Sequence, residues 1–327
     1  MSAKIHVITG ASGHIGYALL VKLLEEGEKV RILIRRDEPR FDALACEKVY
    51  GDVNDYDSLL KAFDGADTVY HLAGIIDINN GDDSLVWKVN FEGVKSVCKA
   101  CRACGVRKLV YASSVDAFKP LPDDALMEEV ARFEPEELEG TYAKTKATAT
   151  NFVFEECQKG LPAVVVYPGA CIGPYDYKVS NVGEMVRMCL HGSMPASLNF
   201  GAYNFVDVRD VADGMIAAAR QGTIGEGYIL CGQRISADEF VAVCLKACGK
   251  KPPKIKIGKG VAAVTAPLAE IYYKLSKSTP LFTRYSIRKI CSNCNFSIEK
   301  AKRELDYSPM SVEKSIQDMV AWIKENK

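Results

Sequence analysis

The sequence lacks an excess of charge of either sign. Its 327 residues include 42 lysine and arginine residues and 42 aspartate and glutamate residues. Nucleic acids and anionic membranes attract proteins through an excess of positive charge. This balance therefore gives no electrostatic reason to expect either partner, and we predict a protein that binds neither.

Long hydrophobic runs are lacking as well. No uninterrupted apolar stretch approaches the roughly 18 residues that indicate a membrane-spanning helix. The strand-like run KIHVIT (4–9) starts so early that it leaves no room for a signal peptide before it. Internal repeats and low-complexity linkers are absent too. Because 48% of the residues are hydrophobic and 26% are charged, we expect a soluble globular protein of the cytoplasm.

Cysteine, by contrast, is abundant, with 12 residues. Cys98, Cys101 and Cys104 are spaced by three, and Cys291 and Cys294 form CSNC. One interpretation is a metal site, but three thiols along one helix cannot easily surround a tetrahedral ion without ligands from elsewhere. Reduced, buried thiols explain the pattern more simply, because cysteine packs as a small hydrophobe. We therefore predict no metal site.

The first half of the chain alternates between strand-like and helix-like segments, and several of the helices end at glycine. Alternation of buried strands with helices predicts an α/β fold with a doubly wound parallel sheet of the Rossmann type. The expected strands are 4–9, 29–35, 47–52, 67–74, 108–114 and 163–169, and the expected helices are 17–27, 55–65, 85–105 and 142–160.

The alternation breaks down after Gly169. NFVDVRDVADGMIAAARQG (204–222) reads as a helix leaving a strand, and GYILCG (227–232) reads as a further strand. We predict a dinucleotide-binding domain of residues 1–170, to which 202–232 returns. A smaller, mostly helical substrate-binding lobe would then comprise 171–201 and 233–327. Within it, the apolar, tyrosine-bearing stretch 260–290 is a candidate lining for a hydrophobic pocket.

Three glycines in TGASGHIG (9–16) separate the first strand from the first helix. Gly10 permits a tight turn, Gly13 lets the backbone approach a pyrophosphate, and Gly16 allows the helix to pack closely on the sheet. Free N–H groups at the helix start would face the phosphates. A tight turn without a ligand is the alternative, but the position between a strand and a helix favours a dinucleotide.

The end of the second strand bears on which dinucleotide binds. NAD-preferring sheets of this type carry an acidic residue there, whereas this sequence has Ile34 followed by Arg35 and Arg36. A guanidinium can pair with a 2′-phosphate, which a carboxylate would repel. The pattern favours NADP(H) over NAD(H). In the alternative interpretation, Asp37 and Glu38 neutralise the two arginines at a solvated strand end.

TYAKTKA places Tyr142 and Lys146 four residues apart, so both project from one face of a helix. Upstream, Ser113 and Ser114 end a strand that points to the same edge of the sheet. A phenol titrates near pH 10, too high for acid–base work at neutral pH. An ammonium about 5 Å away favours the phenolate by about 3 kcal/mol, or roughly two pKa units.

Together these motifs resemble the extended branch of the short-chain dehydrogenase/reductases, the NAD-dependent epimerase/dehydratase superfamily. The resemblance covers essentially the whole chain. The ordered motifs that carry it are TGASGHIG, GDVNDYDSL, HLAG, VNFEG, YASS, YAKTK, YPGACIGP, FVDVRDVADG and SIEKAKRELDYSPMSVEKSIQDMVAWI.

The resemblance implies a role for each catalytic candidate. Tyr142 would be the general acid/base, and Lys146 would hold the nicotinamide ribose and lower the pKa of the tyrosine. Ser114, with Ser113 as second choice, would hydrogen-bond the reacting oxygen, and Asn90 would complete a proton relay through water. The implied cofactor-binding residues are Gly10, Ser12, Gly13, His14, Ile15, Gly16, Arg35, Arg36, Asp52, Val53, Leu72, Ala73, Gly74, Tyr142, Lys146, Pro168, Gly169, Ala170 and Cys171.

Two substrate classes compete within this branch. Sugar-nucleotide epimerases and dehydratases commonly have R-x-x-N-x-Y-G-P, but Tyr167 stands in place of that arginine, and Phe118 stands where they often have tyrosine. The sequence therefore looks more like the dihydroflavonol-4-reductase and 3β-hydroxysteroid dehydrogenase group. A nucleotide diphosphate would need cations in the second lobe, and the candidates are Arg187, Arg209, Arg284 and Arg288.

We therefore predict an NADP-dependent oxidoreductase that interconverts a ketone or aldehyde and an alcohol on a hydrophobic, cyclic, steroid- or flavonoid-like substrate. The alternatives are an NDP-sugar epimerase or dehydratase and a non-catalytic NADP-sensing protein. Family members often dimerise through a pair of helices, which makes a homodimer a further expectation. The acidic segment 119–140 is either a lid or a solvated surface loop.

Overall fold

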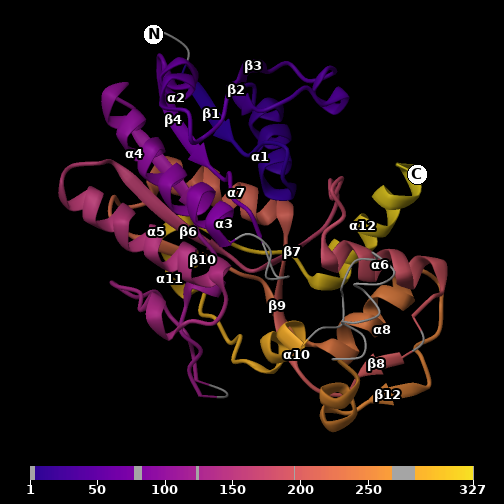
Figure 1. The fold of residues 1–327 in the computed structure, drawn as a ribbon. Coiled ribbons are helices and arrows are strands. Elements are labelled where there is room, and N and C mark those ends of the chain that lie inside the picture. Colours follow the sequence, from indigo (N-terminus) through magenta and orange to yellow (C-terminus); the bar gives the residue numbers. More distant parts are fainter. Residues whose placement is uncertain (1–3, 77–82, 123–124, 195, 267–283, 327) are drawn as a thin grey trace.

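The computed structural model describes residues 4–76, 83–122, 125–194, 196–266 and 284–326. Its largest element is a parallel sheet of seven strands in the order β10-β6-β5-β4-β1-β2-β3, flanked by helices on both faces (Figure 1). The strands are β1 (Ile5–Thr9), β2 (Lys29–Ile34), β3 (Glu47–Tyr50), β4 (Ala66–His71), β5 (Lys108–Ala112), β6 (Ala163–Pro168) and β10 (Gly227–Leu230).

The strand order explains where a ligand can bind. The chain builds β1, β2 and β3 outwards in one direction, then returns to place β4 on the other side of β1. At such a reversal the connections leave the sheet in opposite directions and open a crevice beyond the carboxyl ends of the strands. β5 and β6 are buried along their whole length, as expected for strands covered on both faces. The predicted doubly wound sheet is confirmed.

Two layers of helices cover the sheet. α1 (His14–Glu25), α7 (Val208–Gln221) and α11 (Glu299–Leu305) pack on one face, and α2 (Tyr56–Phe63), α4 (Gly93–Ala103) and α5 (Thr141–Gln158) pack on the other. The glycines expected to end helices do adopt positive φ, at residues Gly27, Gly65, Gly105 and Gly160.

The long helix expected over 85–105 is interrupted. It consists of α3 (Asp83–Trp87), a π-helical turn η2 (Lys88–Glu92) and α4. π-turns within helices are rare and concentrate at functional sites. This one contains Asn90, whose side chain is fully buried.

The C-terminal half supplies a second core outside the large sheet. It is built around α6 (Asn181–His191), α8 (Ala237–Ala247) and α12 (Val312–Glu325), with α10 (Arg284–Cys291) nearby (Figure 1). The helical character of this region is confirmed. The strand expected before the helix of 204–222 is β9 (Ala202–Asp207), which forms a three-stranded sheet with β11 (Gln233–Ser236) and β7 (Ala170–Ile172). The sequence did not predict β7, β11 or the pair formed by β12 (Ile255–Ile257) and β8 (Ala196–Leu198).

The segment 202–232 divides between the two regions. β10 pairs with β6 at the edge of the large sheet, whereas β9 pairs with β7 and β11 in the three-stranded sheet. The domain division at 170, 201 and 232 stays a prediction.

The segment 119–140 is fastened to the protein body in its described part. Met127 is buried and exchanges backbone hydrogen bonds with residues 295 and 297. The Glu129 carboxylate accepts a 2.9 Å hydrogen bond from the Ile229 N–H, and Phe133 packs in the core beside Phe118. Glu129 thus covers an N–H group of the edge strand β10. These contacts argue against a lid, and the buried Met127 and Phe133 show that the segment is also more than a solvated surface loop.

All twelve cysteines are free thiols, and Cys98 and Cys101 lie in the core beneath α4. In the described part of the chain, no group of three or more histidine, cysteine, aspartate or glutamate side chains is placed to hold a metal ion. None of the described helices combines the length and apolar character needed to cross a bilayer.

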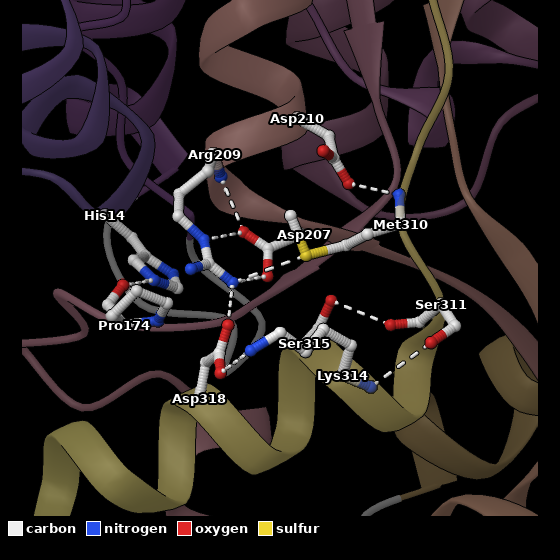
Figure 2. A network of polar contacts seen from close by, with 10 residues as sticks. All are labelled: His14, Pro174, Asp207, Arg209, Asp210, Met310, Ser311, Lys314, Ser315 and Asp318. Atoms are coloured by element: carbon white, nitrogen blue, oxygen red, sulfur yellow. Dashed lines mark hydrogen bonds and ion pairs between the residues drawn. The ribbon is translucent and has the colours of Figure 1, made fainter.

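A polar network joins α7 to α12 (Figure 2). Asp207 caps α7 by accepting a 2.8 Å hydrogen bond from the Arg209 N–H, and its carboxylate also binds the Arg209 guanidinium. The same guanidinium reaches Asp318 of α12 at 2.8 Å. Arg209, one candidate for binding a nucleotide diphosphate, is therefore already paired with two carboxylates.

Asp210 lies next to this network and is buried. Its carboxylate accepts a 2.9 Å hydrogen bond from the Met310 N–H (Figure 2). Burial raises the pKa of Asp210 to about 6. A carboxyl group whose pKa is raised on folding stabilises the folded state at low pH and loses this contribution as the pH rises through its folded pKa.

Asp210→Asn should therefore stabilise the protein at neutral pH but not in acid. Asparagine resembles the protonated carboxyl group, so the free energy of unfolding of the variant relative to the original chain should rise by about 2 kcal/mol between pH 4 and pH 7. Denaturant titrations across this range measure the difference. The exposed Asp306→Asn is the control and should show no such trend. A pH-independent difference for Asp210→Asn would contradict the assignment.

Candidate active site

The glycine turn lies at the strand reversal, against the end of β4. Gly10 has φ of +80°, and a Cβ on it would lie 2.6 Å from the Ala73 nitrogen. No residue with a side chain fits there, so Gly10 is what allows the turn after β1 to touch the segment after β4. Leu72 continues this contact by donating a 3.0 Å hydrogen bond from its N–H to the Thr9 carbonyl.

The other two glycines differ in what surrounds them. A Cβ on Gly16 would overlap the Gly10 carbonyl oxygen, so Gly16 lets α1 pack on the turn itself rather than, as expected, on the sheet in general. A Cβ on Gly13 would meet only that same oxygen, at 3.3 Å, and otherwise open space. No side chain caps the start of α1, where His14 and Ile15 follow Gly13. This open backbone suits an approaching pyrophosphate.

Two side chains of the glycine turn face the segment that follows β7. The His14 Nε2 donates a 2.8 Å hydrogen bond to the Pro174 carbonyl (Figure 2). The Lys178 ammonium donates a 2.9 Å hydrogen bond to the Ser12 hydroxyl. The imidazole of His14 is thus directed at a protein carbonyl, and its predicted contact with a phosphate stays a prediction.

β2 ends at Ile34, as expected, and the side chains of Arg35 and Arg36 are exposed beyond it. The carboxylates of the next two residues, Asp37 and Glu38, bind other side chains. Asp37 accepts a 2.6 Å hydrogen bond from the Tyr50 hydroxyl, and Glu38 pairs with the Arg40 guanidinium. Among the residues that the structure describes, no carboxylate pairs with Arg35 or Arg36. Asp37 and Glu38 thus form no direct ion pair with Arg35 or Arg36 in the described chain, and the preference for NADP(H) stays a prediction.

Asp52 and Val53, the candidates for the adenine contact, follow β3. The Asp52 carboxylate accepts a 2.9 Å hydrogen bond from the Asn54 N–H and a 3.0 Å bond from its side-chain amide. Val53 is buried, and its side chain would lie 3.0 Å from a Cβ on Gly93 of α4. Local packing therefore fixes this corner, and its contact with adenine stays a prediction.

Gly74 lies between two catalytic candidates. A Cβ on it would lie 3.3 Å from the Asn90 Oδ1 and 3.5 Å from the Lys146 Nζ. The absence of a side chain leaves this corner of the crevice accessible beside both groups.

The opposite border of the crevice is formed by the turn from β6 into β7, residues 168–171. A Cβ on Gly169 would lie 3.1 Å from the Asn204 carbonyl oxygen, so glycine permits β6 to approach β9 closely. Cys171 donates a 3.6 Å hydrogen bond to the Gly169 carbonyl, and burial raises the pKa of its thiol to about 12. The thiol of Cys171 is therefore neutral at physiological pH, and its contact with the cofactor stays a prediction.

Lys146 projects from α5 into the protein. Its side chain is buried, and its Nζ donates a 2.8 Å hydrogen bond to the Ala112 carbonyl at the end of β5. The Nζ also lies 5.1 Å from the centre of the Tyr111 ring. Burial lowers the pKa of Lys146 to about 8. The ammonium form thus prevails at neutral pH and loses its proton above about pH 8.

Tyr142 lies one helical turn before Lys146 on the same buried face of α5. Burial raises the pKa of Tyr111 well above its usual range, and the charge of Tyr142 adds to this effect. Tyr142 is therefore close enough to Tyr111 to interact with it electrostatically. The structure brings the Lys146 ammonium to the end of β5 and places Tyr142 one turn away on the buried face of the same helix.

Asn90 fixes the two sides of this site to each other. Its Oδ1 accepts a 2.8 Å hydrogen bond from the Ile75 N–H, and its Nδ2 donates to the Ile75 carbonyl at 3.0 Å and to the Thr145 hydroxyl at 3.2 Å. Thr145 in turn donates a 2.8 Å hydrogen bond to the Tyr142 carbonyl. Sequence reasoning missed Thr145, although it lies between tyrosine and lysine in YAKTK. The network holds Asn90 rigidly, and its role in a water relay stays a prediction.

The two serines after β5 face different ways. Ser113 is 2.7 Å from the Thr150 hydroxyl, which itself donates to the Lys146 carbonyl. Ser113 must therefore donate to Thr150, and its hydroxyl is occupied. Ser114 caps the short helix η3 (Val115–Ala117) by accepting a 3.1 Å hydrogen bond from the Asp116 N–H. Its own proton has no acceptor within the described residues, which favours Ser114 as the donor to a reacting oxygen.

A polar cluster borders the site on the side of the C-terminal half. Asp116 lies 2.7 Å from the Lys289 Nζ of α10 and accepts a 3.2 Å hydrogen bond from the Tyr203 hydroxyl of β9. Tyr167 and Phe118, by contrast, pack edge to face in the core with their ring centres 4.9 Å apart. These two departures from the sugar-nucleotide pattern therefore affect packing rather than substrate contacts. Of the expected pocket segment 260–290, residues 267–283 lie outside the described residues.

The geometry of the turn predicts opposite outcomes for two glycine substitutions. Gly10→Ala places a Cβ against the Ala73 backbone and should lower the free energy of unfolding by about 2–4 kcal/mol. Gly13→Ala should unfold at nearly the original denaturant concentration but bind NADP⁺ at least about tenfold more weakly, because its Cβ fills the open face of the turn. Denaturation and calorimetry separate the two effects. Unchanged affinity in Gly13→Ala would refute the phosphate assignment.

Comparison with known proteins agrees with this geometry. The model of the "NAD dependent epimerase/dehydratase family" matches residues 6–231. Sterol demethylase protein B of Methylococcus capsulatus is 34% identical, over 98% of this chain and 98% of that protein. A putative dihydroflavonol 4-reductase of Synechocystis is 28% identical, over 99% of this chain and 96% of that protein.

A solved structure gives the same result. The crystal structure of gox2253 superimposes with a TM-score of 0.86 at 31% identity and covers 99% of this chain and 98% of that one. The fold, the ordered motifs and the family match agree. The chain belongs to the NAD-dependent epimerase/dehydratase family and is an NAD(P)-dependent enzyme of the extended short-chain dehydrogenase/reductases.

Proposed function

We propose that this enzyme uses NADP(H) to interconvert a ketone or aldehyde and an alcohol on a hydrophobic, cyclic substrate of the steroid or flavonoid type. The observation that carries the proposal is the buried Lys146 ammonium at the end of the strand that leads to Ser114, one helical turn after the buried Tyr142. This set can give a proton to a substrate oxygen or take one from it, which carbonyl reduction and alcohol oxidation require.

The chain's own residues would handle the oxygen and its proton. A bound nicotinamide supplies or accepts the hydride. In the reductive direction, Ser114 donates a hydrogen bond to the carbonyl oxygen, and Tyr142 transfers its proton to that oxygen. The Lys146 ammonium stabilises the phenolate that is left, and Asn90 with Thr145 fixes the helix that carries both groups.

The glycine turn, the end of β4 and the turn after β6 surround the place where the dinucleotide would lie. The open face of Gly13 would receive the pyrophosphate, and Arg35 and Arg36, free of carboxylate partners in the described chain, would favour a 2′-phosphate. Lys146 would hold the nicotinamide ribose.

Tyr142→Phe should reduce turnover by about a hundredfold or more, because it removes the proton that the reaction transfers. The affinity for NADP⁺ should change little, since the ring and its packing stay. Steady-state kinetics and calorimetry measure the two quantities. Tyr307→Phe, which removes a buried hydroxyl that has no partner among the described residues, is the matched control and should keep full activity. Full activity in Tyr142→Phe would overturn the catalytic assignment.

The steroid or flavonoid class has two supports. Relatives similar along nearly the whole chain are named as a sterol demethylase protein and as a putative dihydroflavonol reductase. In addition, two of the four arginines considered for a sugar nucleotide already have carboxylate partners. Arg209 binds Asp207 and Asp318, and the Arg288 guanidinium lies 3.5 Å from the Glu139 carboxylate.

A screen of hydroxysteroids, flavanols and sugar nucleotides with NADP⁺ and NAD⁺ tests the class. We expect oxidation of a hydroxysteroid or flavanol, with kcat/KM at least about tenfold higher for NADP⁺ because two guanidinium groups attract the 2′-phosphate. Turnover of UDP- or dTDP-sugars with tightly held cofactor would instead select the epimerase or dehydratase. A preference for NAD⁺ would refute the argument from Arg35 and Arg36.

A sugar-nucleotide substrate is the second candidate, favoured by one observation. Arg187 on α6 pairs with none of the described carboxylates and could bind a diphosphate. The third hypothesis, a non-catalytic sensor, does not agree with the family's enzymatic character. A cytoplasmic location is supported by twelve free thiols, and a homodimer is carried over by analogy with the family.

A further inference from the structure

The segment after β7 lies across the glycine turn. We call residues 173–180 the strap. Its Pro174 carbonyl accepts the hydrogen bond from His14 (Figure 2). Its Lys178 ammonium donates to the Ser12 hydroxyl. The strap, more than 150 residues later in the chain, therefore contacts the glycine turn at two positions, Ser12 and His14.

The strap is held in one shape by its own contacts. The buried Asp176 carboxylate accepts hydrogen bonds from the Ser180 N–H at 2.9 Å and from the Ser180 hydroxyl at 2.8 Å. Tyr175 and Val179 have φ of 72° and 49°, a region that side chains, and above all the β-branched valine, rarely occupy. Lys178 lies between these two strained positions. Strain of this kind persists where surrounding contacts enforce it and concentrates at functional sites.

The strap and the end of β2 form the two walls of one cleft of about 570 Å³. On the strap side, the Tyr177 ring packs on the Arg40 guanidinium at 4.9 Å and on the Tyr17 ring at 5.0 Å. The cleft is lined by Arg36, Asp37, Glu38, Pro39, Arg40, Tyr177 and Lys178.

The charges of this cleft do not cancel. Both of its carboxylates are engaged by other partners, Asp37 by Tyr50 and Glu38 by Arg40. Within the described part of the chain, none of Arg35, Arg36 and Lys178 pairs with a carboxylate. Lys178 lies close enough to these guanidinium groups for their positive charge to affect its pKa. Desolvation lowers the pKa of Lys178 most, the charge of Glu38 then raises it, and the guanidinium groups of Arg40, Arg35 and Arg36 lower it further.

We propose that Lys178 of the strap joins Arg35 and Arg36 in one site for the 2′-phosphate of NADP(H). A phosphate monoester carries close to two negative charges at neutral pH and would compensate these cations. The guanidinium groups suit two-point contacts with its oxygens, and the ammonium acts as a point charge opposite them. Ser12, whose oxygen accepts from Lys178, keeps its own proton to donate. The inference rests on the proposed use of NADP(H).

The site would therefore be assembled from two distant parts of the sequence. The arginines follow β2, whereas Lys178 comes just before α6, which packs against α8 and α12 in the C-terminal core. The phosphate would thus fasten the C-terminal half to the dinucleotide-binding sheet at the adenosine end. NAD(H), which lacks the phosphate, would not make this connection.

Calorimetry with adenosine 2′,5′-bisphosphate and adenosine 5′-monophosphate tests the proposal without turnover. The original chain should bind the bisphosphate more tightly than the monophosphate. Lys178→Met keeps most of the length of the exposed side chain and removes its charge. It should weaken bisphosphate binding by about tenfold, the effect of one charge-assisted hydrogen bond, and leave monophosphate binding unchanged. Lys178→Arg should restore most of the affinity.

Two further variants complete the design. Arg36→Met should weaken bisphosphate binding in the same selective way. Lys324→Met, on the exposed end of α12, changes the net charge equally and should change neither affinity. Circular dichroism and thermal unfolding verify that each variant is folded.

The outcomes separate the inference from the function on which it rests. If the original chain prefers the bisphosphate and Lys178→Met binds it unchanged, the role of Lys178 is wrong while the preference for NADP(H) stands. If Lys178→Met weakens both ligands equally, the strap acts on the whole adenosine site and the phosphate assignment is also wrong. If the original chain does not prefer the bisphosphate, the proposed cofactor preference and this inference fail together.

Discussion

The catalytic arrangement depends on one buried ammonium group. Lys146 is buried away from water, yet the described chain offers it no carboxylate, and its Nζ donates a hydrogen bond to the neutral Ala112 carbonyl. A counter-carboxylate would stabilise the ammonium but would also cancel its field at Tyr142. The Ala112 carbonyl accepts a hydrogen bond from one N–H of the ammonium group but does not cancel its positive charge. Burial lowers the pKa to about 8, which is the cost of this arrangement and still keeps the group charged at neutral pH.

The rest of the site is a consequence of where this helix can lie. α5 carries Tyr142 and Lys146 to the end of β5 because Thr145 and Thr150 bond its backbone and contact Asn90 and Ser113. On the other side of the crevice, Gly10 lets the turn after β1 contact the backbone after β4. Small residues and short polar side chains, rather than the charged groups themselves, therefore set the distances across the site.

The large sheet and the positions of Tyr142 and Lys146 could be predicted from the sequence. The elements that could not be predicted depend on contacts between distant parts of the chain. Strands β1 to β6 are continuous β-rich runs, and Tyr142 and Lys146 are separated by one helical turn, so local patterns sufficed. The short strands β7, β8, β11 and β12 have only three or four residues each, too few for a sequence pattern to predict them. Pairing with strands distant in the sequence defines them. The π-turn at Asn90 arises from bonds to Ile75 and Thr145, distant in sequence. Lys178 was missed for the same reason, since nothing nearby in the chain marks it.

The two ends of the proposed dinucleotide site share one electrostatic feature. Most cations around them have a carboxylate partner, as Arg40 has Glu38, Lys48 has Asp42 and Arg209 has Asp207 and Asp318. Lys146 at one end and Arg35, Arg36 and Lys178 at the other have none among the described residues. Elsewhere an unpaired cation can be structural, as Lys108 is when it donates to the Gly222 carbonyl. Around the proposed dinucleotide site, however, the absence of a carboxylate keeps the charge of these groups available for an anion or for a developing negative charge.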